Sequence, residues 1–209
     1  MVDASGWQIT ASSTDAGWLP VPEVRDLDAR RRWTDAARDE LRADWGDRWV
    51  PEHEELVGAA LEHALAQREP DDVLCFQLWP VRLPYAAIVH VGLIAPEKPL
   101  DWDEIVGHAT PIELDGVGPG IQRTFAVPVP EAEGELVGLD LVCMGEEVGL
   151  LVRLEPTMED MLAVVGPMLL GFADTIAVTG PGGAAFRSLP PLGVVDGEDG
   201  TWSTGAETA

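Results

Sequence analysis

The chain has 209 residues, 37 of them acidic and 13 basic, which gives a formal net charge of −24 at pH 7. A field of this sign repels nucleic acids and anionic membranes and attracts basic partners. Apolar residues make up 46% of the chain, enough for a buried core, so the charge does not indicate disorder.

The first third of the chain combines short extended segments with two helices. Residues 7–10 predict a strand, and residues 18–22 must be extended because they contain two prolines. Amphipathic helices are predicted at about residues 28–45 and 51–68. In the first helix, one apolar stripe recurs every four residues and consists of Trp33, Ala37, Leu41 and Trp45.

The middle of the chain is typical of a β-sheet. A short helix is predicted at residues 101–108, and residues 136–144 and 148–154 predict a hairpin around a short turn. The other extended runs are residues 73–79, 85–94, 111–114 and 120–129.

A final apolar helix is predicted to begin at Thr157, which is a good N-cap, and to extend its apolar face as far as Ile176. Its charge-free stretch, residues 161–173, is too short to span a membrane, because a transmembrane helix needs about 20 apolar residues. We therefore predict no membrane span.

Gly, Pro, Ser and acidic residues dominate from Gly180 onward. We predict a single α+β domain at residues 1–179 and a flexible, irregular tail at residues 180–209, with Phe186 and Leu189 packed onto the domain.

Three segments resemble proteins of the Mog1/PsbP-like fold group. Residues 17–20 (Gly-Trp-Leu-Pro) are similar to the entry motif of those proteins, and residues 85–91 are similar to a central strand. Residues 154–157, leading to 172–176, are similar to their closing helix. The resemblance covers about residues 5–178 and implies an antiparallel β-sheet flanked by helices on both faces.

That resemblance also implies a binding role. Members of the group are mostly non-enzymatic accessories: photosystem assembly subunits, a nuclear-transport GTPase cofactor, and chaperones for secreted toxins. The binding role is inferred only by analogy between folds, because the function of a protein depends on the site that its fold carries.

Catalytic and metal-binding motifs are not found in the sequence. It has no G-x-S-x-G elbow, no Walker loop and no G-x-G-x-x-G following a strand. His53 and His63 are nearly three helical turns apart, and Glu104 with His108 supplies only two ligands. We therefore predict no catalytic residue, no cofactor and no metal, and place His90 within a strand.

Both cysteines, Cys75 and Cys143, lie in apolar runs, which predicts buried free thiols rather than a disulfide. Together with the lack of a basic-then-apolar leader, this pattern indicates a reducing, cytoplasmic location.

Aromatic residues give the candidate contact surface. The chain has eight tryptophans, and this residue type is enriched at interface hot spots. Trp49 and Trp102 lie beside charges and helix starts, which predicts partial exposure, whereas Trp79 and Tyr85 are expected to line a sheet face or groove. We predict these four residues as partner-binding.

The sequence favours a non-enzymatic accessory protein, a chaperone or adaptor for a basic or apolar protein segment. A structural subunit of a larger assembly and a small enzyme using dispersed carboxylates with His90 or His108 remain as alternatives. Background composition that serves only solubility is the favoured explanation of the acidity, and a dedicated basic partner is the alternative. The oligomeric state is not predicted, because the apolar stripe of residues 28–45 could pack against the sheet of the same chain or against a second copy in a homo-oligomer.

Overall fold

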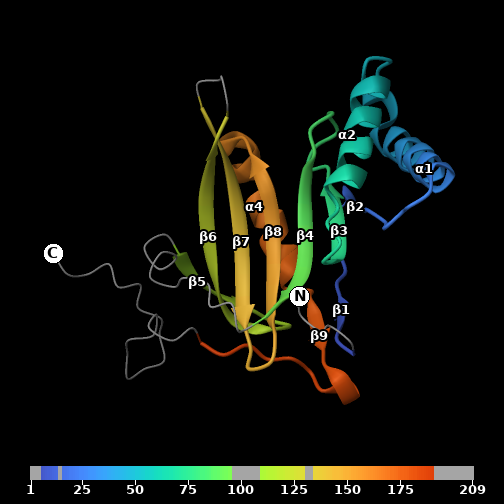
Figure 1. Ribbon diagram of the computed structural model, residues 1–209. Helices are drawn as coiled ribbons and strands as arrows, with labels where there is room; N and C mark the ends of the chain where they lie inside the picture. Colours follow the sequence, from blue (N-terminus) through green and yellow to red (C-terminus); the bar gives the residue numbers. More distant parts are fainter. Residues whose placement is uncertain (1–5, 14–15, 96–108, 130–133, 191–209) are drawn as a thin grey trace.

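A seven-stranded antiparallel sheet forms the centre of the computed structural model, which describes residues 6–13, 16–95, 109–129 and 134–190. Its strand order is β2-β3-β4-β8-β7-β6-β5, so β8 lies between β4 and β7 (Figure 1). The strands are β2 (Trp18–Pro20), β3 (Asp72–Leu78), β4 (Ala87–Ile94), β5 (Ala109–Leu114), β6 (Gly118–Pro128), β7 (Glu135–Met144) and β8 (Gly149–Thr157).

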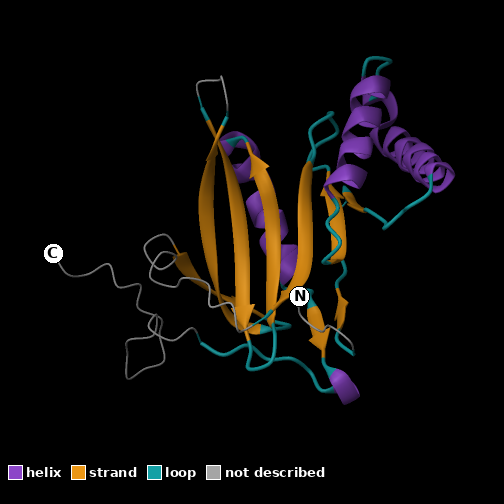
Figure 2. Cartoon of the chain, in the orientation of Figure 1, coloured by secondary structure: helices purple, strands orange, loops and turns teal. Residues whose placement is uncertain are grey.

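One face of this sheet is covered by helix α4 (Glu159–Ala173), which lies behind β7 and β8 in Figure 2. Alternate residues of the central strands point toward this helix and form the main core. Val89, Val152 and Leu154 are fully buried there against the helix residues Val165 and Leu169.

The opposite face is covered by helices over β2, β3 and the start of β4, where Ile88 packs in one cluster with the helix residue Ala64. Helices α1 (Leu27–Trp45) and α2 (His53–Gln67) pack on this end of the sheet and form two smaller apolar clusters (Figure 1). The predicted α+β fold, with helices on both faces of an antiparallel sheet, is therefore confirmed. None of the described helices is long and apolar enough to cross a membrane.

Helix α1 follows from its sequence. Asp26 is its N-cap and accepts a hydrogen bond from Ala29 N–H, and Gly46 ends it at a φ of +53°. The predicted stripe is confirmed: Ala37, Leu41 and Trp45 are buried, in a cluster that includes residues of α2 and β2. The stripe therefore packs against other elements of the same chain.

Helix α4 differs from the prediction at both ends. Thr157 is the last residue of β8, paired with Val137, so the predicted N-cap is wrong and Met158 takes that position. The helix ends at Ala173 rather than extending to Ile176. The Thr175 hydroxyl donates to Phe172 O and accepts from Ser12 N–H, which favours a turn at this point.

After that turn, β9 (Ala177–Thr179) pairs antiparallel with β1 (Gln8–Thr10). Phe186 is 6% exposed within the main core, which confirms that it packs on the body. Leu189 N–H donates to Met144 O, although its side chain is 49% exposed. The helix predicted at residues 101–108 and the tail beyond residue 190 lie outside the described residues, and the domain division stays a prediction.

Both thiols are buried and free, as predicted. Burial, with a smaller contribution from Glu113, raises the pKa of Cys143 to about 12. Relative to an ordinary thiol of pKa 9.0, the thiolate fraction at pH 8 falls by about three orders of magnitude. We therefore expect iodoacetamide to modify Cys143 only when the chain is unfolded, measured by mass spectrometry with and without guanidinium. Native labelling at the rate of the unfolded chain would contradict this expectation.

Candidate functional site

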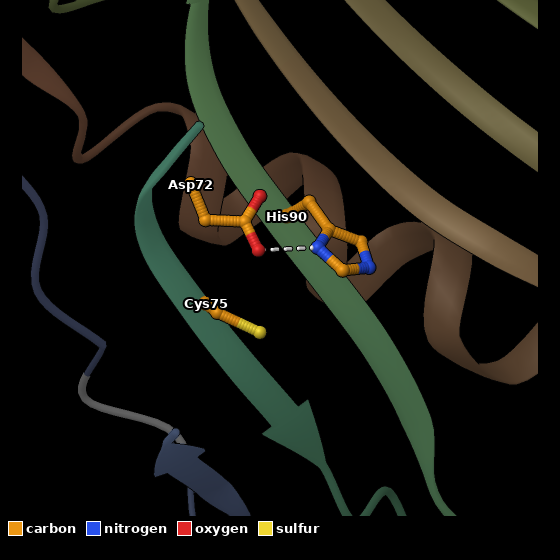
Figure 3. A group of neighbouring side chains, drawn as sticks. All are labelled: Asp72, Cys75 and His90. Atoms are coloured by element: carbon orange, nitrogen blue, oxygen red, sulfur yellow. Dashed lines mark hydrogen bonds and ion pairs between the residues drawn. The ribbon is translucent and has the colours of Figure 1, made fainter. Parts of the chain in front are cut away.

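A β-bulge in β3 brings a carboxylate, a thiol and an imidazole together. Cys75 pairs directly with His90 of β4, so their side chains share one sheet face. Asp72 pairs with Gly92 and Leu74 with Val91, which leaves one extra residue in β3. If β3 were regular over this stretch, Asp72, three residues before Cys75, would point to the opposite face; the bulge places both side chains on one face. Figure 3 shows the resulting group of Asp72, Cys75 and His90.

His90 lies between two carboxylates. Its Nδ1 is 2.8 Å from Asp72 Oδ2, and its Nε2 is 3.1 Å from Glu155 Oε1 on the neighbouring strand β8. The backbone N–H of Glu69 also donates to Asp72 Oδ2, at 2.8 Å. The side chains of His90 and Asp72 are only 10% and 6% exposed, so strand pairing, burial and hydrogen bonds all fix this arrangement.

The imidazole of His90 is charged at neutral pH. Burial opposes the charged form, but hydrogen bonds with Asp72, Cys75 and Glu155 outweigh burial and raise the pKa of His90 to about 11. Both ring nitrogens therefore donate, each to a carboxylate. A nucleophilic role for Cys75 is disfavoured by access, because the residue is 2% exposed.

The pairing of His90 continues into a line of polar residues across the same face. Its members pair one with the next through β3, β4, β8, β7 and β6, and we call them the polar row. The polar row consists of Cys75, His90, Arg153, Asp140 and Arg123.

Asp140 holds two arginines together in this row. Its side chain is 1% exposed, and it accepts hydrogen bonds from Nε and Nη2 of both Arg123 and Arg153, at 2.8 to 3.1 Å. Both guanidinium groups also lie 5.7 Å from the ring centroid of Phe125. A Cβ at the paired Gly138 would clash with this ring, so glycine there gives Phe125 its place.

A groove of about 590 Å³ lies over this part of the sheet. Apolar residues of β4, β8 and β6, among them Ile94, Leu151 and Phe125, contribute to its lining. Carboxylates from the turn before β3, from the first residue of β3 and from β8 form its acidic rim, which we define as Glu69, Asp71, Asp72 and Glu155. Two members of the polar row, His90 and Arg153, also line the groove, so the groove and this part of the row form one site.

The predicted contact residues lie elsewhere. Trp79 is 3% exposed and packs edge-on against Trp45, at 5.8 Å between ring centroids, and Trp49 is half-buried beside the same indole. Tyr85 is 49% exposed and lines a separate groove of about 270 Å³. Trp102 lies outside the described residues. The buried indole of Trp79 offers little surface to a partner, so the surface proposed below excludes it.

Sequence reasoning missed Asp72, Cys75 and Glu155 as neighbours of His90. The available signal was weak: two consecutive strands separated by prolines can pair, which makes Cys75 a potential neighbour of His90. The position of Asp72 depends on the bulge, and that of Glu155 depends on β8 pairing with β4. Neither is visible in the local pattern.

Comparison with known proteins finds only remote similarity. No protein-family model matches the chain, and no curated protein matches its sequence. Among solved structures, it is similar to the solution structure of cyanobacterial PsbP (CyanoP) from Synechocystis sp. PCC 6803. The two share 13% identity with a TM-score of 0.36, and the match covers 82% of this chain and 91% of that chain. This match agrees with the predicted PsbP-like resemblance, and at this degree of similarity it carries no argument about function.

Proposed function

We propose that the chain is a non-enzymatic binding protein, and that the groove over the polar row binds an extended segment of a partner protein. The segment would present arginine or lysine side chains next to apolar ones. The observation that carries this proposal is the combination of an apolar lining, from Ile94, Leu151 and Phe125, with the acidic rim.

Charge complementarity favours this occupant over others. The chain has a net charge of −24, which attracts basic segments over a distance set by the ionic strength. The rim residues Glu69 and Asp71 are exposed, so they are available to pair with cations of a partner. Apolar side chains of the segment would bury the exposed surface of the groove, including Val127, which is 39% exposed.

The test compares two charge-reversal variants that change the net charge by the same amount. Glu69→Arg with Asp71→Arg reverses the rim, and Glu146→Arg with Glu147→Arg reverses the exposed turn between β7 and β8. Each tagged chain is incubated with a lysate of its host at low and high salt, and the retained proteins are identified by mass spectrometry.

We expect the unaltered chain and the turn variant to retain the same partner, carrying a basic segment, and the rim variant to bind it about tenfold more weakly. High salt should reduce the difference, because rim charges are screened. Equal retention by all three chains, or loss in the turn variant only, would refute the groove as the binding surface. Failure of the unaltered chain to retain any partner would refute the binding function itself.

A further inference from the structure

The cluster around His90 has the donor atoms of a metal site. One carboxylate oxygen of Asp72, the sulfur of Cys75 and one ring nitrogen of His90 all lie within 4.8 Å of one another (Figure 3). In a tetrahedral zinc site, bonds of 2.0 to 2.3 Å separate the ligand atoms by roughly 3.3 to 3.8 Å. Small side-chain rotations therefore bring the three donors to the required spacing.

We propose that Asp72, Cys75 and His90 bind one Zn²⁺ ion, with a fourth coordination position open to the groove. A set of one thiolate, one imidazole and one carboxylate suits this borderline-soft ion better than Mg²⁺ or Ca²⁺, which prefer all-oxygen sites. Two anionic ligands and one neutral ligand balance the charge of the ion. On binding, the Cys75 thiol and the His90 imidazolium each release one proton to solvent.

Glu155 supplies the supporting contact that zinc-bound histidines normally have. Its carboxylate lies 3.1 Å from His90 Nε2, on the side of the ring away from Asp72. A carboxylate in this position keeps a proton on Nε2 and leaves the lone pair of Nδ1 for the metal. Glu155 therefore acts as a positioning residue rather than as a ligand.

The site also has an entry path and a rigid frame. Asp72 and His90 line the groove of about 590 Å³, so an ion from solvent reaches them first, and Cys75 is the inner ligand. Cys75 and His90 are held opposite each other by strand pairing, and the bulge fixes Asp72. This inference does not depend on the proposed partner segment.

Cobalt is the probe that distinguishes this site from metal adsorbed on the acidic surface. The reduced, chelator-treated full chain is titrated with Co²⁺ alone while its absorption spectrum is recorded. We expect tetrahedral visible bands and a near-ultraviolet thiolate-to-cobalt band that saturate at one ion per chain and disappear when Zn²⁺ is added. Co²⁺ adsorbed on exposed carboxylates gives neither the thiolate band nor saturation at one equivalent, and that result would overturn the proposal.

Cysteine variants identify the ligand. Cys75→Ser should abolish the thiolate band, whereas Cys143→Ser, a change at a second buried thiol, should retain it. The reverse pattern would refute the site. The titration of the unaltered chain remains decisive if a variant fails to fold.

Glu155→Gln tests the role of the positioning residue. This variant should keep the cobalt spectrum and weaken Zn²⁺ binding by about tenfold or more, and an unchanged affinity would overturn the role assigned to Glu155.

Discussion

Replacing Trp45 with alanine is expected to lower the free energy of unfolding by about 3 to 5 kcal/mol. Trp45 is 2% exposed and its ring centroid lies 5.2 Å from that of Trp49 and 5.8 Å from that of Trp79. It therefore joins α1 to the end of β3, and its removal leaves a cavity among other large side chains. Urea denaturation followed by circular dichroism measures the loss without depending on the missing indole.

The matched control is Leu56→Ala on helix α2, at a side chain that is 54% exposed. It should change the free energy of unfolding by about 0.5 kcal/mol or less. If Trp45→Ala costs no more than this control, the packing of α1 and α2 against the sheet is not as the structure has it.

Replacing Asp140 with alanine is expected to lower the free energy of unfolding by about 2 to 4 kcal/mol. The substitution removes a carboxylate that is 1% exposed and leaves Arg123 and Arg153 next to each other without their shared counter-ion. Breaking a buried ion pair costs about 3 to 5 kcal/mol, and the side chains of these arginines are 28% and 40% exposed, which moderates the cost. Urea denaturation is again the measurement.

Asp39→Ala serves as the control for this second substitution. Asp39 pairs with Arg42 on the surface of α1, and its side chain is 72% exposed. Surface pairs of this kind contribute about 1 kcal/mol or less. Similar losses for Asp39→Ala and Asp140→Ala would mean that the hydrogen bonds of Asp140 do not stabilise the sheet.

Helices α1 and α2 were predicted well because their pattern is local. The four-residue spacing of the apolar stripe of α1, from Trp33 to Trp45, favours a helix whatever it packs against. Thr157 shows the limit of this reasoning. Its sequence context suits a helix N-cap, but strand pairing with Val137 keeps it in β8.

The site could not be predicted, because its residues meet only through pairing between strands. Alternation places His90 and Arg153 on particular faces of their own strands, but it does not say that β8 lies beside β4. Asp72 is even harder to predict, because regular alternation places it on the opposite face of the sheet from Cys75 and His90. The contact surface predicted from Trp49, Trp79, Tyr85 and Trp102 rested on residue type and on neighbouring residues in the sequence, and neither distinguishes a core indole from an exposed one.

The buried carboxylate in the centre of the sheet also restricts how the strands can align during folding. If β7 slipped by two residues against β6 or β8, each apolar side chain would still face the same side, so burial alone would tolerate the error. The slip would nevertheless move Asp140 out of register with one of the two arginines that it pairs with, and would leave the buried carboxylate with fewer charged partners. One side chain thus makes a single alignment of three strands more stable than its nearest alternatives.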